Sequence, residues 1–149
     1  MGDRKYLPTL AELIDRLSIS QLKEVKLADH KEEYAMEISD IVHDIQMILD
    51  ENKGVVNAEV IRAIVVLSQM NAHIWHNESA VRAGTAGPSN LALTHGINGI
   101  RNTAKNKIQE VVGGRLDYKV DCLAADFNDW EISWNWGFFL TRVVSIVLL

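Results

Sequence analysis

The chain has 149 residues, 48% of them hydrophobic, which suits one domain with a sizeable core. Its formal net charge of -5 at pH 7 is not the basic balance of proteins that bind DNA or RNA through phosphates, so we expect no nucleic-acid partner. Cys122 is the only cysteine, which excludes an intramolecular disulfide and favours a reducing, cytoplasmic location. The N-terminal residues show neither a secretory signal nor a myristoylation pattern.

The first two elements predicted are helices, and the pattern as a whole predicts an all-α antiparallel bundle of about five helices. Thr9 and Glu12 form a T-x-x-E capping box, and apolar residues then recur every three or four positions to about Leu27. Asp29 is expected to cap the second helix, which should end at Asn52-Lys53-Gly54.

The third and fourth helices follow, with boundaries at polar and glycine residues. Asn57 is expected to cap the third, whose run VIRAIVVLSQM is apolar nearly all round and therefore predicts a central position. This helix should end at residues 84–88, and the next should run from Ser89 to Val112. A fifth helix is predicted over about 117–130, beyond which WEISWNWGFF fits either a helix or a strand.

The C-terminal residues 133–149 form an apolar extension of the single domain predicted over 1–149. The run GFFLTRVVSIVLL is shorter than the roughly 20 residues that cross a bilayer, and Arg142 lies in its middle. We expect a buried helix or a contact between copies in a homo-oligomer, rather than a membrane anchor. A cloning or reading-frame extension is the remaining alternative.

The segment MNAHIWHNESAVRAG, residues 70–84, contains the pattern His-x-x-His-x-Glu, which suggests metal binding. His73 and His76 are three residues apart and can share a helix face, but Glu78 is five from the first and two from the second, so it points elsewhere. Zinc needs three or four ligands that converge. We therefore favour no metal at these histidines.

A different set of residues in this segment does share one face. Asn71, Trp75, Glu78 and Arg82 are spaced i, i+4, i+7 and i+11, which places a polar stripe where a core face is expected. Polar residues on two other helices match this stripe: Asp15 and Ser18 on the first, and Asn98, Arg101, Asn102 and Lys105 on the fourth. If these faces meet, their charges must be paired or must bind a ligand.

Two interpretations of this predicted cluster are open. Asp15 and Glu78 are neutralised by Arg82, Arg101 and Lys105 in an internal network, or the three cations hold an anion such as phosphate, sulfate or a sugar nucleotide. In the second case Trp75 could stack on a ring of the ligand. Both make the protein a binding or assembly module rather than an enzyme, and no catalytic residue is assigned.

The rival interpretation is a Mg²⁺ site. Both Glu12-Leu-Ile-Asp15 and Glu37-Ile-Ser-Asp40 have the E-x-x-D spacing, which puts two carboxylates on one helix face and suits Mg²⁺ with phosphates. EISDIVHDI, residues 37–45, resembles the second metal-binding helix of the all-α MazG-like nucleotide pyrophosphatases. That resemblance implies a Mg²⁺-dependent pyrophosphatase, but the E-E-x-x-E helix of those enzymes has no counterpart before Glu37.

The polar stripes also carry a wider resemblance, over roughly residues 10–120. LIDRLSISQLKEVKL, NAHIWHNESAVR and INGIRNTAKNKIQEVVGGRL resemble, in order and spacing, a family of small helical proteins of unknown function from bacteria and from marine phage-like or environmental sequences. Its segments read D-[KR]-L-[ST]-I-x-x-x-K, N-x-x-[LI]-W-x-x-E-[DS]-x-[IV]-R and N-D-x-R-x-x-x-K-x-x-I-N. The resemblance implies a helical fold and surface-polysaccharide or glycosyltransferase neighbourhoods, but no established reaction.

Residue by residue, the resemblance covers the polar stripes and also shows departures. The pattern positions are occupied by Asp15, Arg16, Ser18, Lys23, Asn71, Trp75, Glu78, Arg82, Asn98, Arg101 and Lys105. Ser79 stands where an acidic residue is commoner, Gly99 replaces the aspartate after Asn98, and Gln109 replaces the terminal asparagine. A site that depended on those residues would be weakened in this chain.

Overall fold

The computed structural model describes residues 2–87, 89–113, 116 and 132–135, and these residues confirm the all-α prediction. They contain the four α-helices α1 (Leu10–Lys26), α2 (Lys31–Glu51), α3 (Ala58–Arg82) and α4 (Ser89–Val112). Short 3₁₀ helices span Ala28–His30 and Ser133–Asn135. The fifth predicted helix, and the predicted apolar extension beyond 135, lie outside the described residues.

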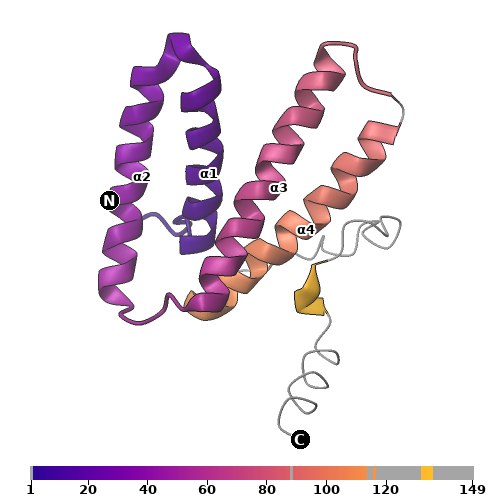
Figure 1. Ribbon diagram of the computed structural model, residues 1–149. Helices are drawn as coiled ribbons and strands as arrows, with labels where there is room; N and C mark the ends of the chain where they lie inside the picture. The colour runs from indigo at the N-terminus through magenta and orange to yellow at the C-terminus, as the bar shows by residue number, and fades with distance from the viewer. Residues whose placement is uncertain (1, 88, 114–115, 117–131, 136–149) are drawn as a thin grey trace, which may run out of the picture.

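The helices form two antiparallel hairpins, α1–α2 and α3–α4, as Figure 1 shows. Contacts between the hairpins run from α1 to both α3 and α4, whereas α2 packs mainly against α1. Because each hairpin reverses the chain, α1 and α3 run in the same direction, and the hairpins diverge toward the C-terminal ends of these two helices (Figure 1). None of the described helices combines the length and the apolar character that a membrane crossing requires.

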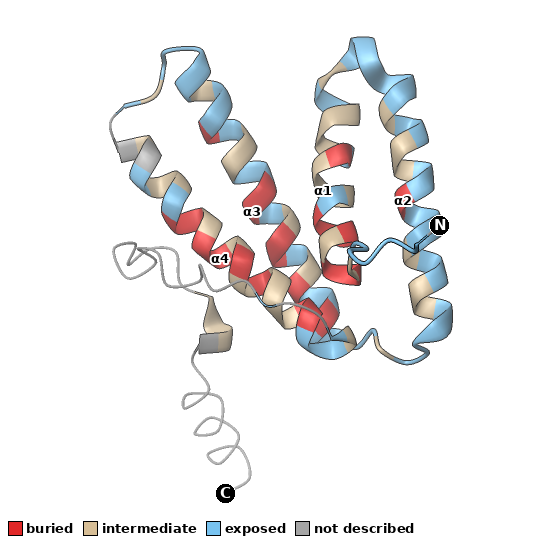
Figure 2. Cartoon of the chain, turned by 180° about the vertical axis from the view of Figure 1, so that it is seen from behind, coloured by how far each residue is buried: buried red, intermediate tan, exposed pale blue. Residues whose placement is uncertain are grey.

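The hydrophobic core lies where α1, α3 and α4 are in contact. Its buried side chains come from all three helices: Leu10, Ala11, Ile14, Ala63, Val66, Leu67, Met70, Ile97, Ile100, Ala104 and Ile108. Figure 2 shows the buried residues of α1 and α3 concentrated toward the end of the fold where the two hairpins meet. The third helix is thus buried, as predicted, on the sides that face α1 and α4. Ile61 and Val65 on α3 are 55% and 50% exposed, so the helix is not surrounded on all sides.

Two of the three predicted helix caps are present. Thr9 and Glu12 form the predicted capping box of α1, and the Asn57 side chain accepts a hydrogen bond from the Val60 backbone N–H at the start of α3. The cap predicted at Asp29 is wrong, because this residue lies inside a 3₁₀ turn and α2 begins two residues later, at Lys31. The N-cap of α2 is His30, which makes no side-chain cap hydrogen bond.

Replacing Asn57 by alanine is expected to lower the free energy of unfolding by about 1 kcal/mol, because the Val60 N–H loses the acceptor that lies 2.9 Å away. Urea denaturation measures this change. Asn57→Asp, which keeps a side-chain acceptor, should stay within a few tenths of a kcal/mol of the wild type. Equal losses in both variants would contradict a capping role for this side chain.

Candidate functional site

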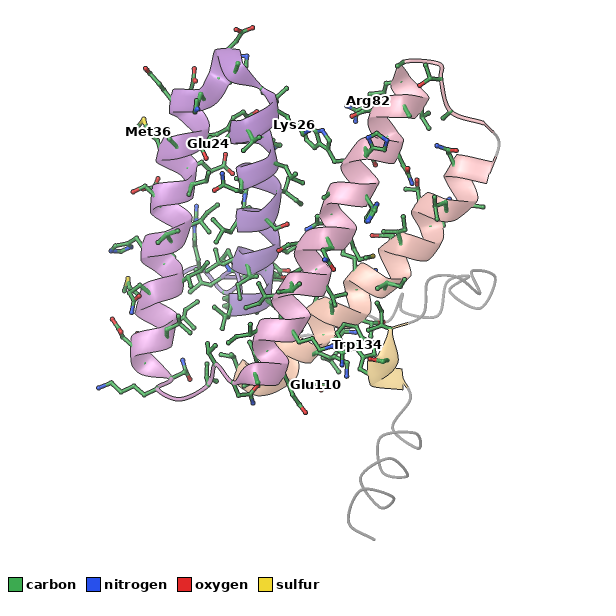
Figure 3. All side chains as sticks on the ribbon, in the orientation of Figure 1. Glu24, Lys26, Met36, Arg82, Glu110 and Trp134 are labelled. Carbon is green, nitrogen blue, oxygen red and sulfur yellow. The ribbon has the colours of Figure 1, made fainter. Side chains whose placement is uncertain are left out.

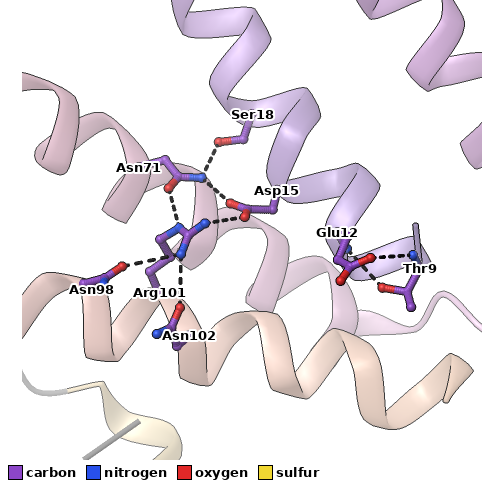
Figure 4. Close-up of polar contacts among 8 residues, drawn as sticks. All are labelled: Thr9, Glu12, Asp15, Ser18, Asn71, Asn98, Arg101 and Asn102. Atoms are coloured by element: carbon purple, nitrogen blue, oxygen red, sulfur yellow. Dashed lines mark hydrogen bonds and ion pairs between the residues drawn. The ribbon is translucent and has the colours of Figure 1, made fainter. Parts of the chain in front are cut away.

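A group of polar side chains from α1, α3 and α4 meets around Asn71, as Figure 4 shows. Its Nδ2 group donates to Asp15 Oδ1 at 2.9 Å and to Ser18 Oγ at 3.0 Å, and its Oδ1 accepts from Arg101 Nε at 2.8 Å. One amide therefore links α1 to α4 from its place on α3. Asn71 is 5% exposed, so these bonds replace water that the side chain loses on folding.

Arg101 supplies the positive charge that neutralises the Asp15 carboxylate. Its Nη2 forms an ion pair with Asp15 Oδ2, and its Nη1 donates to Asn102 Oδ1 at 3.0 Å and to Asn98 Oδ1 at 3.4 Å. The side chains of Arg101 and Asp15 are only 19% and 11% exposed. The two opposite charges thus neutralise each other inside the fold, and every nitrogen of the guanidinium group already donates to an acceptor.

Local helix geometry explains why these side chains point to one place. Asp15 and Ser18 are three residues apart on α1, and Asn98, Arg101 and Asn102 are spaced i, i+3 and i+4 on α4, so each set shares one helix face. We call these five residues together with Asn71 the polar cluster. It lies directly beside the apolar core, whose packing brings the three faces together.

A pocket of about 230 Å³ lies against the polar cluster, between α1, α3 and α4. We call it the inter-hairpin pocket. Apolar and aromatic side chains form part of its wall, and polar side chains form the rest: Ile19, Leu22, Ile74 and Trp75, with Asn71, Glu78, Asn98 and Arg101. Aliphatic walls with a few polar groups are typical of small-molecule sites.

Four of the residues predicted for the buried cluster lie outside the polar cluster, and two of them, Trp75 and Glu78, line the inter-hairpin pocket. The Glu78 and Arg82 side chains are 53% and 81% exposed and form an i, i+4 ion pair with Nη2 and Oε2 3.7 Å apart. Lys105 is half-buried and does not line the inter-hairpin pocket. Glu78 thus pairs with Arg82, one of its three predicted partners, but the expectation that this pair is buried is wrong, because the hairpins diverge beyond Asn71 and leave the last turns of α3 uncovered on that side.

The four carboxylates of the predicted Mg²⁺ site are dispersed. Glu12 caps α1 by accepting from the Thr9 backbone N–H at 2.9 Å (Figure 4), while Asp15 is paired with Arg101. Glu37 accepts from Ser20 Oγ at 2.9 Å, and Asp40 is exposed on α2. Among the described residues, no three His, Cys, Asp or Glu side chains lie close enough to share a metal ion.

The histidines of the His-x-x-His-x-Glu pattern do not form a site either. His73 and His76 are both exposed on α3, and neither lines the inter-hairpin pocket. Asn71 and Trp75 face α1 and α4. His73 is two positions from each of these residues and His76 directly follows Trp75, so both histidines point away from α1 and α4.

Two polar arrangements were not predicted. Trp134 lies beside Arg62 and Lys107, whose cationic groups are 5.4 and 5.0 Å from the ring, and a second pocket of about 270 Å³ opens there with Glu59 and Glu110 in its wall. Asn77 is 8% exposed, and its Nδ2 has no hydrogen-bond partner among the described residues. No sequence signal distinguishes Asn77 from an ordinary surface asparagine.

Comparisons of the chain with protein-family models, with curated proteins and with solved structures found no match.

Proposed function

We propose that the protein is a binding module whose ligand enters the inter-hairpin pocket, while the polar cluster pairs internally and fixes the arrangement of the two hairpins. One observation carries this proposal. Five of the residues chosen from the sequence for a polar site recur in the wall of one pocket, whereas Asp15, Arg82 and Lys105 do not: the five are Asn71, Trp75, Glu78, Asn98 and Arg101. A pocket that combines an indole, aliphatic side chains and a few polar groups fits a small amphipathic ligand.

The charges of the polar cluster support internal pairing. Arg101 is already engaged with Asp15 and three amide oxygens, so an anion at this guanidinium would have to displace a buried carboxylate. Separating a buried pair costs several kcal/mol because it leaves a charge without its partner. We therefore assign Asp15 and Arg101 to the structure of the pocket rather than to ligand capture.

Magnesium-dependent pyrophosphate hydrolysis is not proposed. It would need Glu12, Asp15, Glu37 and Asp40 to meet around one ion, and each of the first three is instead bonded to a different group of the protein. Self-association through the apolar C-terminal residues stays a prediction, since those residues lie outside the described part.

The proposal is tested by a thermal-shift screen of nucleotides, sugar nucleotides and inorganic anions, each with and without Mg²⁺. A ligand at roughly 100 times its Kd should stabilise the folded protein by about 2.7 kcal/mol. The ligand-induced rise in unfolding temperature should disappear in Leu22→Trp, which fills the pocket with an indole, and should persist in Val25→Trp. Val25 is a matched control because it is on the same helix, 69% exposed and outside the pocket wall.

Two results would contradict the proposal. A ligand that stabilises the wild type and Leu22→Trp equally would bind elsewhere on the protein. A screen in which no compound raises the unfolding temperature would favour a purely structural role for the polar cluster.

A further inference from the structure

The inter-hairpin pocket is layered from its floor to its mouth. Asn71 and Arg101 belong to the polar cluster at the floor, and Ile19, Leu22 and Trp75 provide apolar walls above it. On α1 the spacing continues from Ile19 and Leu22 to Lys26, at i, i+3 and i+7. On α3 the same spacing leads from Trp75 through Glu78 to Arg82. The faces of α1 and α3 that line the pocket thus each continue, beyond the lining residues, to a cation.

Figure 3 shows Lys26 and Arg82 at the same end of the fold, on helices that flank the gap between the hairpins. Both are exposed, and they lie in the last turns of α1 and α3. Among the described residues that line the pocket, Glu78 is the only carboxylate, and it pairs with Arg82. Asp15 and Arg101 pair with each other deeper in the fold, so among Lys26, Arg82 and Glu78 the cations outnumber the carboxylate by one.

We propose that the ligand of this pocket is an amphipathic anion: a carboxylate or phosphate joined to an aromatic or aliphatic body. The body contacts Trp75, Ile19 and Leu22, and the anionic head lies at the mouth between Lys26 and Arg82. This inference rests on the proposed binding function and names the ligand class. It moves the anion predicted from the sequence away from Arg101, each of whose guanidinium nitrogens already donates to the protein, to the exposed cations Lys26 and Arg82.

The ion pair between Glu78 and Arg82 can be broken by a ligand at little cost in free energy. Its atoms are 3.7 Å apart and both side chains are more than half exposed, so water screens the pair and it contributes little to stability. An anionic head can therefore take Arg82 from Glu78 at small cost. Glu78 opposes an anion by repulsion and by competing for Arg82, so it sets how tightly the head is held.

A simpler explanation of Lys26 and Arg82 is that basic residues in the last turn interact favourably with the helix dipole. That explanation predicts a small loss of stability on substitution and no effect on ligand binding. The two accounts therefore differ in a binding measurement, whereas they agree in a measurement of stability.

The experiment uses probes that share one skeleton and differ in charge: phenylacetate, 2-phenylethanol and 2-phenylethylammonium, with phenyl phosphate as the second anionic head. Each is titrated into the full-length protein while the indole N–H signal of Trp75, assigned with Trp75→Phe, is followed by NMR. Phenylacetate and phenyl phosphate should bind more tightly than the alcohol, and the ammonium compound least tightly. Comparison of the two anions shows which head the mouth prefers.

Substitutions at the mouth should shift the affinity in opposite directions. Arg82→Gln and Lys26→Gln should each weaken phenylacetate binding roughly three- to tenfold and leave 2-phenylethanol binding unchanged. Glu78→Gln should tighten phenylacetate binding by a similar factor. Lys53→Gln, which removes an exposed cation after the C-terminal end of α2, is the matched control and should change nothing.

Each of the remaining possible results contradicts a specific part of the proposal. If the ammonium compound binds most tightly, or if Glu78→Gln weakens the anions, the pocket still binds ligands but the anionic class is wrong. If the three glutamine variants bind phenylacetate as the wild type does, the charges at the mouth serve only the helices. If no probe shifts the Trp75 signal, the proposed binding function fails together with this inference.

Discussion

Replacing Arg101 by methionine is expected to lower the free energy of unfolding by roughly 3–5 kcal/mol, because it leaves the Asp15 carboxylate buried without its cation. Urea denaturation followed by circular dichroism measures the loss. Methionine keeps much of the length of the side chain, so the effect reports mainly on charge and hydrogen bonds. The four groups that accept from Arg101 would all lose a donor.

Two further variants decide whether the buried charge is the cause. Adding Asp15→Asn to Arg101→Met should recover part of the loss, since the amide removes the charge and can still accept from Asn71. Arg16→Met provides the surface control, because Arg16 is 68% exposed and lies 3.4 Å from Glu37, and it should cost less than about 1 kcal/mol. Similar losses for Arg101→Met and Arg16→Met would show that the Asp15 pair is solvated.

The second large effect is expected in the apolar core. Leu67 is fully buried on α3 among core residues of α1 and α4, so Leu67→Ala should lower the free energy of unfolding by about 2–5 kcal/mol through lost burial and a remaining cavity. Ile61→Ala on the same helix is the control, because Ile61 is 55% exposed, and should cost less than about 1 kcal/mol. A Leu67→Ala variant as stable as Ile61→Ala would contradict the placement of the core.

The sequence was sufficient to predict most of the described helix boundaries. The capping box at Thr9 and the cap at Asn57 are local chemistry, and they occur where the pattern placed them. Asp29 has the same capping chemistry, yet the chain reverses there through a 3₁₀ turn that packs against both α1 and α2. A preference of a few tenths to about 2 kcal/mol for a cap does not decide a turn that two packed helices constrain.

The candidate site was predictable only in part. Helical spacing correctly placed Asn71 and Arg101 on faces that meet Asp15, because which residues share a face is a local property of each helix. The same spacing placed Glu78 and Arg82 in the buried cluster, where they are not. How far a neighbouring helix continues beside a stripe depends on the angle between the hairpins, and core residues distant in sequence set that angle.

The polar cluster also has a consequence for the order in which the chain folds. Its bonds join residues 56 and 86 positions apart, whereas each hairpin is closed by a short turn between consecutive helices. Closing long loops is slower than forming local contacts, so we expect the hairpins to form before they dock. We therefore expect the pair between Asp15 and Arg101 to form only when the hairpins dock, and any part of its stabilisation that is absent from the transition state slows the unfolding of the native protein.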